Sequence, residues 1–213
     1  TNTVFAETGH DHGTWDVWGD DDGEKTSLPG TAGDYVLTSD ITLSSTWTVP
    51  EGTTNLCLNG FVINANCTED NKFSVIIVGE GATLNLYDCG TTVHNGYVDS
   101  TGLWHLGTGE GTAKTIIGGI ITGGNISVTN GNGGGLRVDK GVFNMYGGNI
   151  VGNYASNGAG VQASSVKDGA EALFNMSGGT ISYNNAKSAG GGVSISNKNV
   201  VFNMTGGEIT NNV

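Results

Sequence analysis

The stretch Phe174-Asn175-Met176-Ser177-Gly178-Gly179-Thr180-Ile181 decides the fold, because it recurs at a nearly constant interval. A close copy begins 31 residues earlier, at Phe143, and another begins 28 residues later, at Phe202. Weaker copies begin at three earlier positions, which are Leu56, Leu84 and Lys114. A repeat of about 30 residues is typical of a solenoid, in which each unit buries its apolar face by stacking on its neighbours.

Each copy alternates apolar and other residues over a few positions, which is the periodicity of a β-strand. The Gly-Gly pair in the middle lets the backbone turn a corner. Stacking the six copies predicts three inward columns: Leu56, Leu84, Phe143, Phe174 and Phe202; Leu58, Leu86, Ile116, Met145, Met176 and Met204; and Ile63, Ile121, Ile150, Ile181 and Ile209. A third strand is expected after the other glycine clusters, at Leu136, Val161 and Val193. Three strands per unit predict an all-β chain folded as a parallel β-helix.

The Phe-Asn-Met-x-Gly-Gly-x-Ile units, with Gly-Gly-Gly-Val between them, resemble right-handed parallel β-helix repeats of the pectate-lyase type. More narrowly, they are similar to repeats in large secreted or wall-anchored proteins of anaerobic Gram-positive bacteria. The stretches Asn55-Leu56-Cys57-Leu58-Asn59-Gly60 and Leu86-Tyr87-Asp88-Cys89 resemble the first coils of that group. The resemblance covers about residues 28–213 and implies a right-handed solenoid of about six coils outside the cell. It implies no particular activity, because such domains include lyases, hydrolases and adhesins.

The chain divides into three parts. Residues 1–6 end in a Val-x-Ala pattern like a signal-peptide cleavage site, so they are interpreted as the remnant of an export signal or as a disordered start. Residues 7–50 are expected to cap the open end of the first coil. Residues 51–213 hold the repeats, and we expect them to continue in a longer polypeptide or to meet another subunit, because the sequence stops midway through a copy.

The charge balance argues against several partners. Twenty acidic and eight basic residues give a net charge of −12, which disfavours nucleic acid and anionic membrane surfaces. There is no run of 18 apolar residues, so no membrane insertion is expected. The acidic run Asp20-Asp21-Asp22-Gly23-Glu24 lacks the alternating ligands of an EF-hand. We therefore expect no required cofactor, with Ca²⁺ as the ion that such an acidic turn would accept.

Metal binding is one hypothesis for the N-terminal segment. His10 and His12, with Asp16 nearby, could bind zinc or another transition metal through imidazole and carboxylate groups. The alternative is a segment whose Trp15 and Trp18 simply cover the end of the first coil.

The three cysteines, Cys57, Cys67 and Cys89, leave at least one thiol without a partner in the chain. The assumed register places Cys57 and Cys89 on adjacent coils but four residues apart. A disulfide between them requires the corner at Asp88 to fold back. Cys67 is the other predicted partner for Cys89.

Two sets of outward residues carry the functional hypotheses. If the chain is an enzyme, Arg137 and Asp139 are the catalytic candidates, since lyases of this type use an acid to hold Ca²⁺ and a cationic base. The alternative ligand-binding residues are Tyr87, Tyr146, Asn144, Asn175, His94 and Trp104. Asparagines recur in two columns and are expected to form stacked amide ladders: Asn85, Asn144, Asn175 and Asn203; and Asn66, Asn153, Asn184 and Asn212.

The sequence therefore predicts a secreted or cell-surface module, an adhesin or stalk, that is not catalytic and that binds neutral glycans or a host-surface ligand. The main alternative is a polysaccharide lyase or glycoside hydrolase, although no two outward carboxylates stack at the spacing of a hydrolase pair. A third alternative is ice binding, for which a broken row of Thr92, Thr122, Ser182 and Thr210 is the only pattern.

Overall fold

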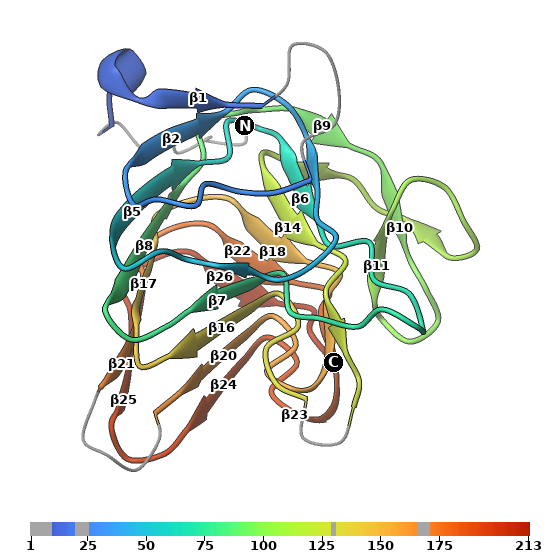
Figure 1. Ribbon diagram of the computed structural model, residues 1–213. Coiled ribbons are helices and arrows are strands. Elements are labelled where there is room, and N and C mark those ends of the chain that lie inside the picture. Colours follow the sequence, from blue (N-terminus) through green and yellow to red (C-terminus); the bar gives the residue numbers. More distant parts are fainter. Residues whose placement is uncertain (1–9, 20–25, 129–130, 166–170) are drawn as a thin grey trace.

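The structure is a computed structural model that describes residues 10–19, 26–128, 131–165 and 171–213. The predicted export-signal remnant at residues 1–6 and the acidic run at residues 20–24 lie outside the described residues. The described chain is all-β apart from one short 3-10 helix, η1 (His12–Thr14). Its strands form sheets that extend from the N-terminal copies at the top of Figure 1 to the C-terminal copies at the bottom.

Three parallel sheets carry the repeats. Sheet A contains, in spatial order, β1 (Asp16–Trp18), β2 (Asp34–Leu37), β5 (Gly52–Cys57), β8 (Ala82–Tyr87), β17 (Val142–Met145), β21 (Ala172–Met176) and β25 (Val200–Met204). Sheet B contains β3 (Ile41–Thr42), β6 (Val62–Asn64), β14 (Ile120–Thr122), β18 (Asn149–Val151), β22 (Thr180–Ser182) and β26 (Glu208–Thr210). Sheet C contains β4 (Trp47–Thr48), β7 (Ile76–Val78), β16 (Leu136–Asp139), β20 (Val161–Ser164) and β24 (Val193–Ser196).

The chain visits sheets A, B and C in turn, and each strand pairs in parallel with its counterpart in the next copy. A short parallel sheet of β15 (Asn125–Ile126), β19 (Tyr154–Asn157) and β23 (Asn185–Ala189) lies between sheets B and C along the chain. This arrangement of stacked parallel sheets is compatible with the predicted β-helix.

One core cluster runs from Leu28 to Ile181 between the sheets, and in the C-terminal half it contains the predicted inward columns. Phe174 is fully buried between Phe143 and Phe202, with ring centroids 5.0 and 4.7 Å apart and nearly parallel planes. The isoleucine column from Ile63 to Ile209 pairs residue by residue in sheet B, as predicted. Stacking identical side chains in register fills the space between the sheets without large gaps.

The two other predicted columns are correct from Leu84 and Leu86 onward, where these residues pair with Phe143 and Met145, but wrong at Leu56 and Ile116. Leu56 lies opposite Leu86, and Thr54 lies opposite Leu84, so the true register is shifted by two residues. Ile116 belongs to neither column, because it pairs in an antiparallel ladder outside sheet A. The first error is hard to avoid from the sequence, because a shift of two residues preserves the inward face of a strand.

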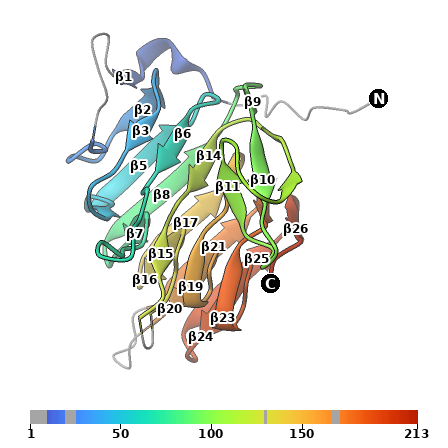
Figure 2. The same ribbon diagram turned by 90° about the vertical axis from the view of Figure 1, so that its right-hand side faces the viewer.

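Residues 93–117 explain the second error, because they leave the parallel sheets as an excursion (Figure 2). The excursion contains β9 (Val93–His94), β10 (Gly96–Val98), β11 (Trp104–Leu106), β12 (Thr112–Ala113) and β13 (Ile116–Ile117), all paired antiparallel. As a result β8 pairs directly with β17, and the stretch that begins at Lys114 is not a separate copy.

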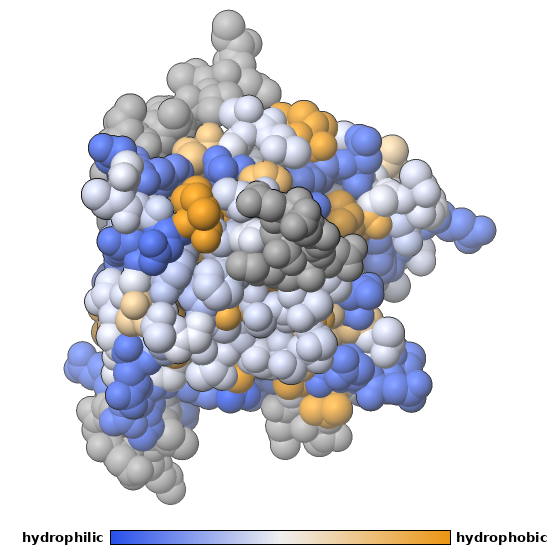
Figure 3. All heavy atoms as spheres, turned by 45° about the horizontal axis from the view of Figure 1, so that its top comes forward, coloured by the Kyte–Doolittle hydropathy of each residue, from blue (hydrophilic) through white to orange (hydrophobic). Residues whose placement is uncertain are grey.

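Residues 34–48, which the sequence analysis assigned to the cap, supply the outermost strands of sheets B and C and the second strand of sheet A, where β1 is outermost. Their strands β2, β3 and β4 pair with the following copy in sheets A, B and C respectively. Where Figure 3 shows described residues on this side, most are of intermediate hydropathy, with patches of hydrophilic residues and separated apolar spots. Whether residues 7–50 act as a cap stays a prediction.

The backbone conformation at the corners between the strands requires glycine. Gly148, Gly179 and Gly207 each have a positive φ of 78–82°. A Cβ at Gly179 would lie 2.6 Å from the carbonyl oxygen of Gly148 in the preceding copy. Only glycine tolerates both conditions, as the sequence argument expected.

Candidate functional site

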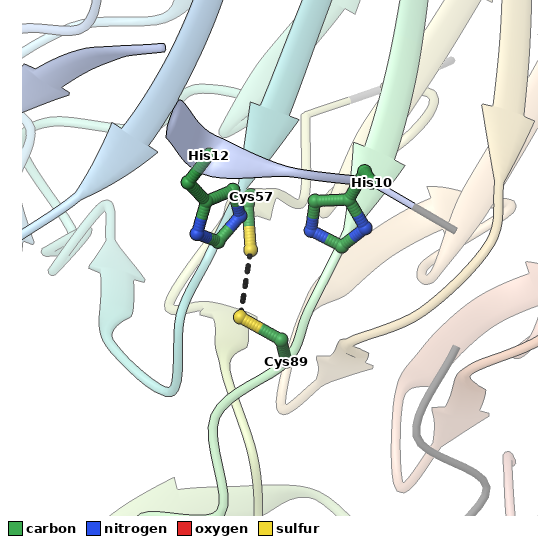
Figure 4. A group of neighbouring side chains, drawn as sticks. All are labelled: His10, His12, Cys57 and Cys89. Carbon is green, nitrogen blue, oxygen red and sulfur yellow. Dashed lines mark hydrogen bonds between the residues drawn. The ribbon is translucent and has the colours of Figure 1, made fainter. Parts of the chain in front are cut away.

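Two histidines and two cysteines converge beside sheet A, near its N-terminal edge (Figure 4). His10 and His12 come from the segment that leads into β1, Cys57 ends β5, and Cys89 follows β8. One donor atom from each of these side chains lies within 4.8 Å of the other three. Among the residues that the structure describes, this Cys–His cluster is the one group of three or more such ligands close enough to hold a metal ion.

The N-terminal segment approaches sheet A through aromatic contacts. The His10 ring lies 4.5 Å from the Tyr87 ring and 5.2 Å from the Trp15 ring, measured between centroids. Strand alternation turns Leu56 inward and Cys57 outward. Cys57 is nevertheless fully buried, with His10 and His12 beside it. The side chain of Cys57 therefore lies on the outer face of sheet A but is not exposed to solvent.

A corner at Asp88 brings Cys89 back toward Cys57. The Asp88 carboxylate accepts backbone N–H groups from Gly60 at 2.8 Å and from Gly119 at 2.7 Å, so it ties the corner to two other segments. Burial raises the pKa of Asp88, although these backbone hydrogen bonds act in the opposite direction. Cys57 lies opposite Tyr87 in the parallel strand pair, so Cys89 is offset from Cys57 by only two residues in register. The Sγ atoms of the two cysteines lie 3.5 Å apart.

The surroundings of Cys57 and His10 favour the neutral forms of these two side chains. Burial raises the pKa of the Cys57 thiol, and its contact with Cys89 acts in the same direction. Burial lowers the pKa of His10, as does the nearby His12, while Asp88 opposes them. Both ring nitrogens of His10 and Nε2 of His12 are buried without a hydrogen-bond partner in the described part of the chain. A neutral imidazole with an unused lone pair is the form that binds metals.

The predicted metal ligands are therefore only partly brought together. His10 and His12 meet, but Asp16 is an exposed residue of β1 outside the cluster. Sequence reasoning missed Cys57 and Cys89 as ligands, because the assumed register placed them four residues apart. The one signal in the sequence that could have indicated a shared site was that Cys57 and Cys89 lie on adjacent copies of a chain that also contains paired histidines.

For the predicted disulfide, the structure places Cys57 next to Cys89 and holds all three cysteines as thiols. Cys67 lies elsewhere, with its Sγ donating to the carbonyl oxygen of Phe73 at 3.4 Å. Burial raises the pKa of this thiol, and hydrogen bonds act in the opposite direction. Of the two predicted partners for Cys89, only Cys57 is adjacent in the structure.

An asparagine ladder lies beside the cluster on the outer face of sheet A. Each amide donates to the side chain of the preceding copy at 2.6–2.9 Å, in the order Asn203, Asn175, Asn144, Asn85, Asn55 and Asp34. The predicted ladder is thus confirmed and extends two copies further toward the N-terminus. Tyr87 and Tyr146 stack in the neighbouring outward column, with centroids 4.8 Å apart.

The second predicted ladder is confirmed in part. Asn153 donates to Asn184 and Asn184 donates to Asn212, each at 3.0 Å. Asn153 and Asn184 are fully buried, so these amides hold the turns and are not a binding surface. Asn66 is exposed and shows no hydrogen bond to Asn153.

The other two candidate ligand-binding residues lie on the excursion. His94 is half-buried, and its Nε2 lies 2.9 Å from the carbonyl oxygen of Gly60. Trp104 is buried against Val62, Ile120 and Val151, so its ring does not face solvent. The row of threonine and serine residues considered for ice binding is interrupted in sheet B, since Thr122 and Ser182 are buried.

The candidate catalytic residues pair with each other. Arg137 Nη2 lies 2.7 Å from Asp139 Oδ2 in β16 of sheet C. The second carboxylate oxygen of Asp139 accepts a hydrogen bond from Ser164 Oγ at 2.8 Å. Lys140, the next cation along the chain, pairs with Glu80 at 3.2 Å. The structure brings Arg137 and Asp139 together as an ion pair.

No protein-family model, curated protein or solved structure matches this chain. In the described part of the chain, no helix is both long enough and apolar enough to cross a membrane.

Proposed function

We propose that the chain is a right-handed parallel β-helix of the pectate-lyase type that acts as a non-catalytic module at the cell surface or in the secreted fraction. We further propose that it serves as an adhesin or stalk whose ligand is a neutral glycan. The asparagine ladder is the observation that carries this proposal, because it forms a continuous polar strip on the outer face of sheet A.

The strip keeps hydrogen-bonding capacity for a ligand. Each amide from Asn55 to Asn175 uses one N–H toward one neighbour and one oxygen lone pair toward the other. A side-chain amide has two N–H groups and two lone pairs, so one of each stays available per copy. Sugar hydroxyls both donate and accept, and they suit such a surface without requiring any charge.

The stacked Tyr87–Tyr146 pair supplies the apolar part of the strip. Both rings are half-buried and nearly parallel. An aromatic face packs against the C–H face of a sugar ring, and for one such contact we take the scale of an aromatic pair, about 0.5–1.5 kcal/mol beyond burial. The net charge of −12 favours a neutral glycan over a polyanion.

The salt bridge of Arg137 supports a non-catalytic role. A general base must hold its proton-accepting group within hydrogen-bond reach of the substrate and in the correct protonation state. Here the guanidinium is engaged by Asp139, whose carboxylate also accepts from Ser164. The pair is suited to strengthening sheet C rather than to abstracting a proton.

Glycan-array binding of the soluble chain tests the ligand. We expect binding to neutral glycans in preference to uronic-acid polymers, weakened about tenfold by Tyr146→Ala. Tyr97→Ala is the control, because Tyr97 is also half-buried and stacked, but on His105 in the excursion. No glycan binding, or equal losses in the two variants, would contradict the proposed ligand.

Incubation with pectin, alginate and mucin glycans, with and without Ca²⁺, tests the absence of catalysis. We expect no release of unsaturated products or reducing ends. Turnover that disappears in Arg137→Ala would instead assign the lyase alternative, with Arg137 as the base and Asp139 as its partner.

A further inference from the structure

We propose that His10, His12, Cys57 and Cys89 bind one structural Zn²⁺ that fastens the N-terminal segment to the outer face of sheet A. This inference goes beyond the proposed module function and does not depend on it. It rests on the convergence of four metal-ligating side chains from three separate segments (Figure 4).

The donor set selects the metal. Two thiolates and two imidazoles in a tetrahedral arrangement are typical of zinc, whereas Ca²⁺ and Mg²⁺ require oxygen ligands. Four protein ligands also leave no open coordination position. A closed site of this kind holds structure together and does not activate water.

The dimensions fit after small side-chain rotations. Zinc lies about 2.3 Å from a thiolate sulfur and about 2.0–2.1 Å from an imidazole nitrogen, so donors in a tetrahedron lie about 3.3–3.8 Å apart. The two sulfur atoms are 3.5 Å apart, which is already in this range. No donor pair in the cluster exceeds 4.8 Å, so contraction by about 1 Å or a little more completes the geometry.

The cluster also has unsatisfied atoms that a metal would satisfy. Three imidazole nitrogens of His10 and His12 are buried without a hydrogen-bond partner in the described part of the chain. A buried polar atom without a partner is costly. Coordination by Zn²⁺ would engage one nitrogen of each ring, and the Trp15 and Tyr87 rings beside them restrict the orientation of the imidazoles.

Binding must release protons. Zn²⁺ coordinates thiolates, so the two S–H groups of Cys57 and Cys89 lose their protons to solvent, and the ion's two positive charges are balanced by the two sulfurs. The histidines bind as neutral imidazoles and contribute no charge to the site. The affinity should therefore increase by about 100-fold for each pH unit between roughly 6.5 and 7.5.

A disulfide between Cys57 and Cys89 is the competing chemistry. It would consume both thiols, and its sulfur atoms would approach to about 2.05 Å. It would also leave the two histidines with no role in the cluster. The two states are mutually exclusive, so a single sample can be assigned to one or the other by its thiol count and zinc content.

The test uses the full chain, purified with a reducing agent, stripped by a chelator and titrated with zinc against a chromophoric chelator. We expect one zinc per chain and a loss of affinity of more than about 100-fold in Cys57→Ser, Cys89→Ser and His10→Gln/His12→Gln, since even second-shell changes cost about 10–100-fold. Cys67→Ser is the matched control and should bind zinc as the wild type does.

Two further measurements distinguish a specific loss of zinc binding from misfolding of a variant. Because the histidines lie outside the packed core, His10→Gln/His12→Gln should keep the wild-type circular dichroism while losing zinc. Zinc should also slow amide hydrogen exchange at residues 10–18 of the wild type. Absence of zinc from the reduced wild type, or unchanged affinity in the histidine variant, would overturn the proposal.

Discussion

The C-terminal copies of this molecule repeat regularly, whereas its N-terminal side does not. From Phe143 onward, side chains at equivalent positions pair with each other in sheets A, B and C, so that one copy describes the next there. Before Phe143, the period is broken by the excursion at residues 93–117, and the N-terminal segment packs beside Cys57. The regular part stacks equivalent side chains in register, and the irregular part gathers the four side chains of the Cys–His cluster.

The largest effect is expected at the centre of the regular part. Phe174→Ala should lower the free energy of unfolding by about 3–5 kcal/mol, because it leaves a cavity between two stacked rings. Phe202→Ala should cost less, since Phe202 is only half-buried. Urea denaturation of both variants measures the difference, and equal losses would show that the column does not act as a packed stack.

A smaller effect is expected from the buried amide ladder. Asn184→Ala removes the acceptor of Asn153 and should cost about 1–3 kcal/mol, because it leaves buried polar groups without partners. Asn144→Ala, in the half-buried ladder of sheet A, should cost about 1 kcal/mol, since water can replace its hydrogen bonds. The same denaturation assay compares the two variants. A larger loss of stability in Asn144→Ala than in Asn184→Ala would contradict the view that the buried ladder is structural and the ladder of sheet A is a binding strip.

The smallest effect is a pH dependence confined to the excursion. Burial acts to raise the pKa of Asp99, but hydrogen bonds from His105 and Thr101 outweigh it and lower the pKa to about 2. A carboxyl group with a depressed pKa in the folded state stabilises the fold above its unfolded pKa of about 3.9. That contribution is lost as the pH falls from about 4 to about 2.

Denaturation of the zinc-free protein between pH 5 and pH 2.5 checks this expectation. Asp99→Asn should be less stable than the wild type at pH 5 and should approach it at pH 2.5. A constant difference between the two proteins across this range would show that the Asp99 carboxylate does not stabilise the excursion.

Sequence reasoning was most successful where the repeat is regular. The Phe-Asn-Met motif predicted the inward column at Phe174, the asparagine ladder and the glycine corners, because each residue type has one structural reason to recur. It was less successful between the copies at Leu56 and Leu84, where the motif is reduced to two leucines and a shift of two residues cannot be detected from alternation alone.

The candidate metal site could not be assembled from the sequence for the same reason. Its ligands recur in no other copy, so the period carries no information about them. His10 and His12 were recognisable as a pair, but Cys57 and Cys89 join them only through the true register and the corner at Asp88. Tertiary placement of a non-repeated segment is beyond what periodicity can predict.

X-ray absorption spectroscopy of the zinc-loaded protein tests most directly whether the irregular side of the molecule is organised by a metal. The proposal predicts two sulfur neighbours at about 2.3 Å and two nitrogen neighbours at about 2.0–2.1 Å from the zinc. In Cys57→Ser the sulfur shell should fall to one neighbour or the zinc should be lost. A spectrum with only oxygen and nitrogen neighbours in the wild type would contradict the account.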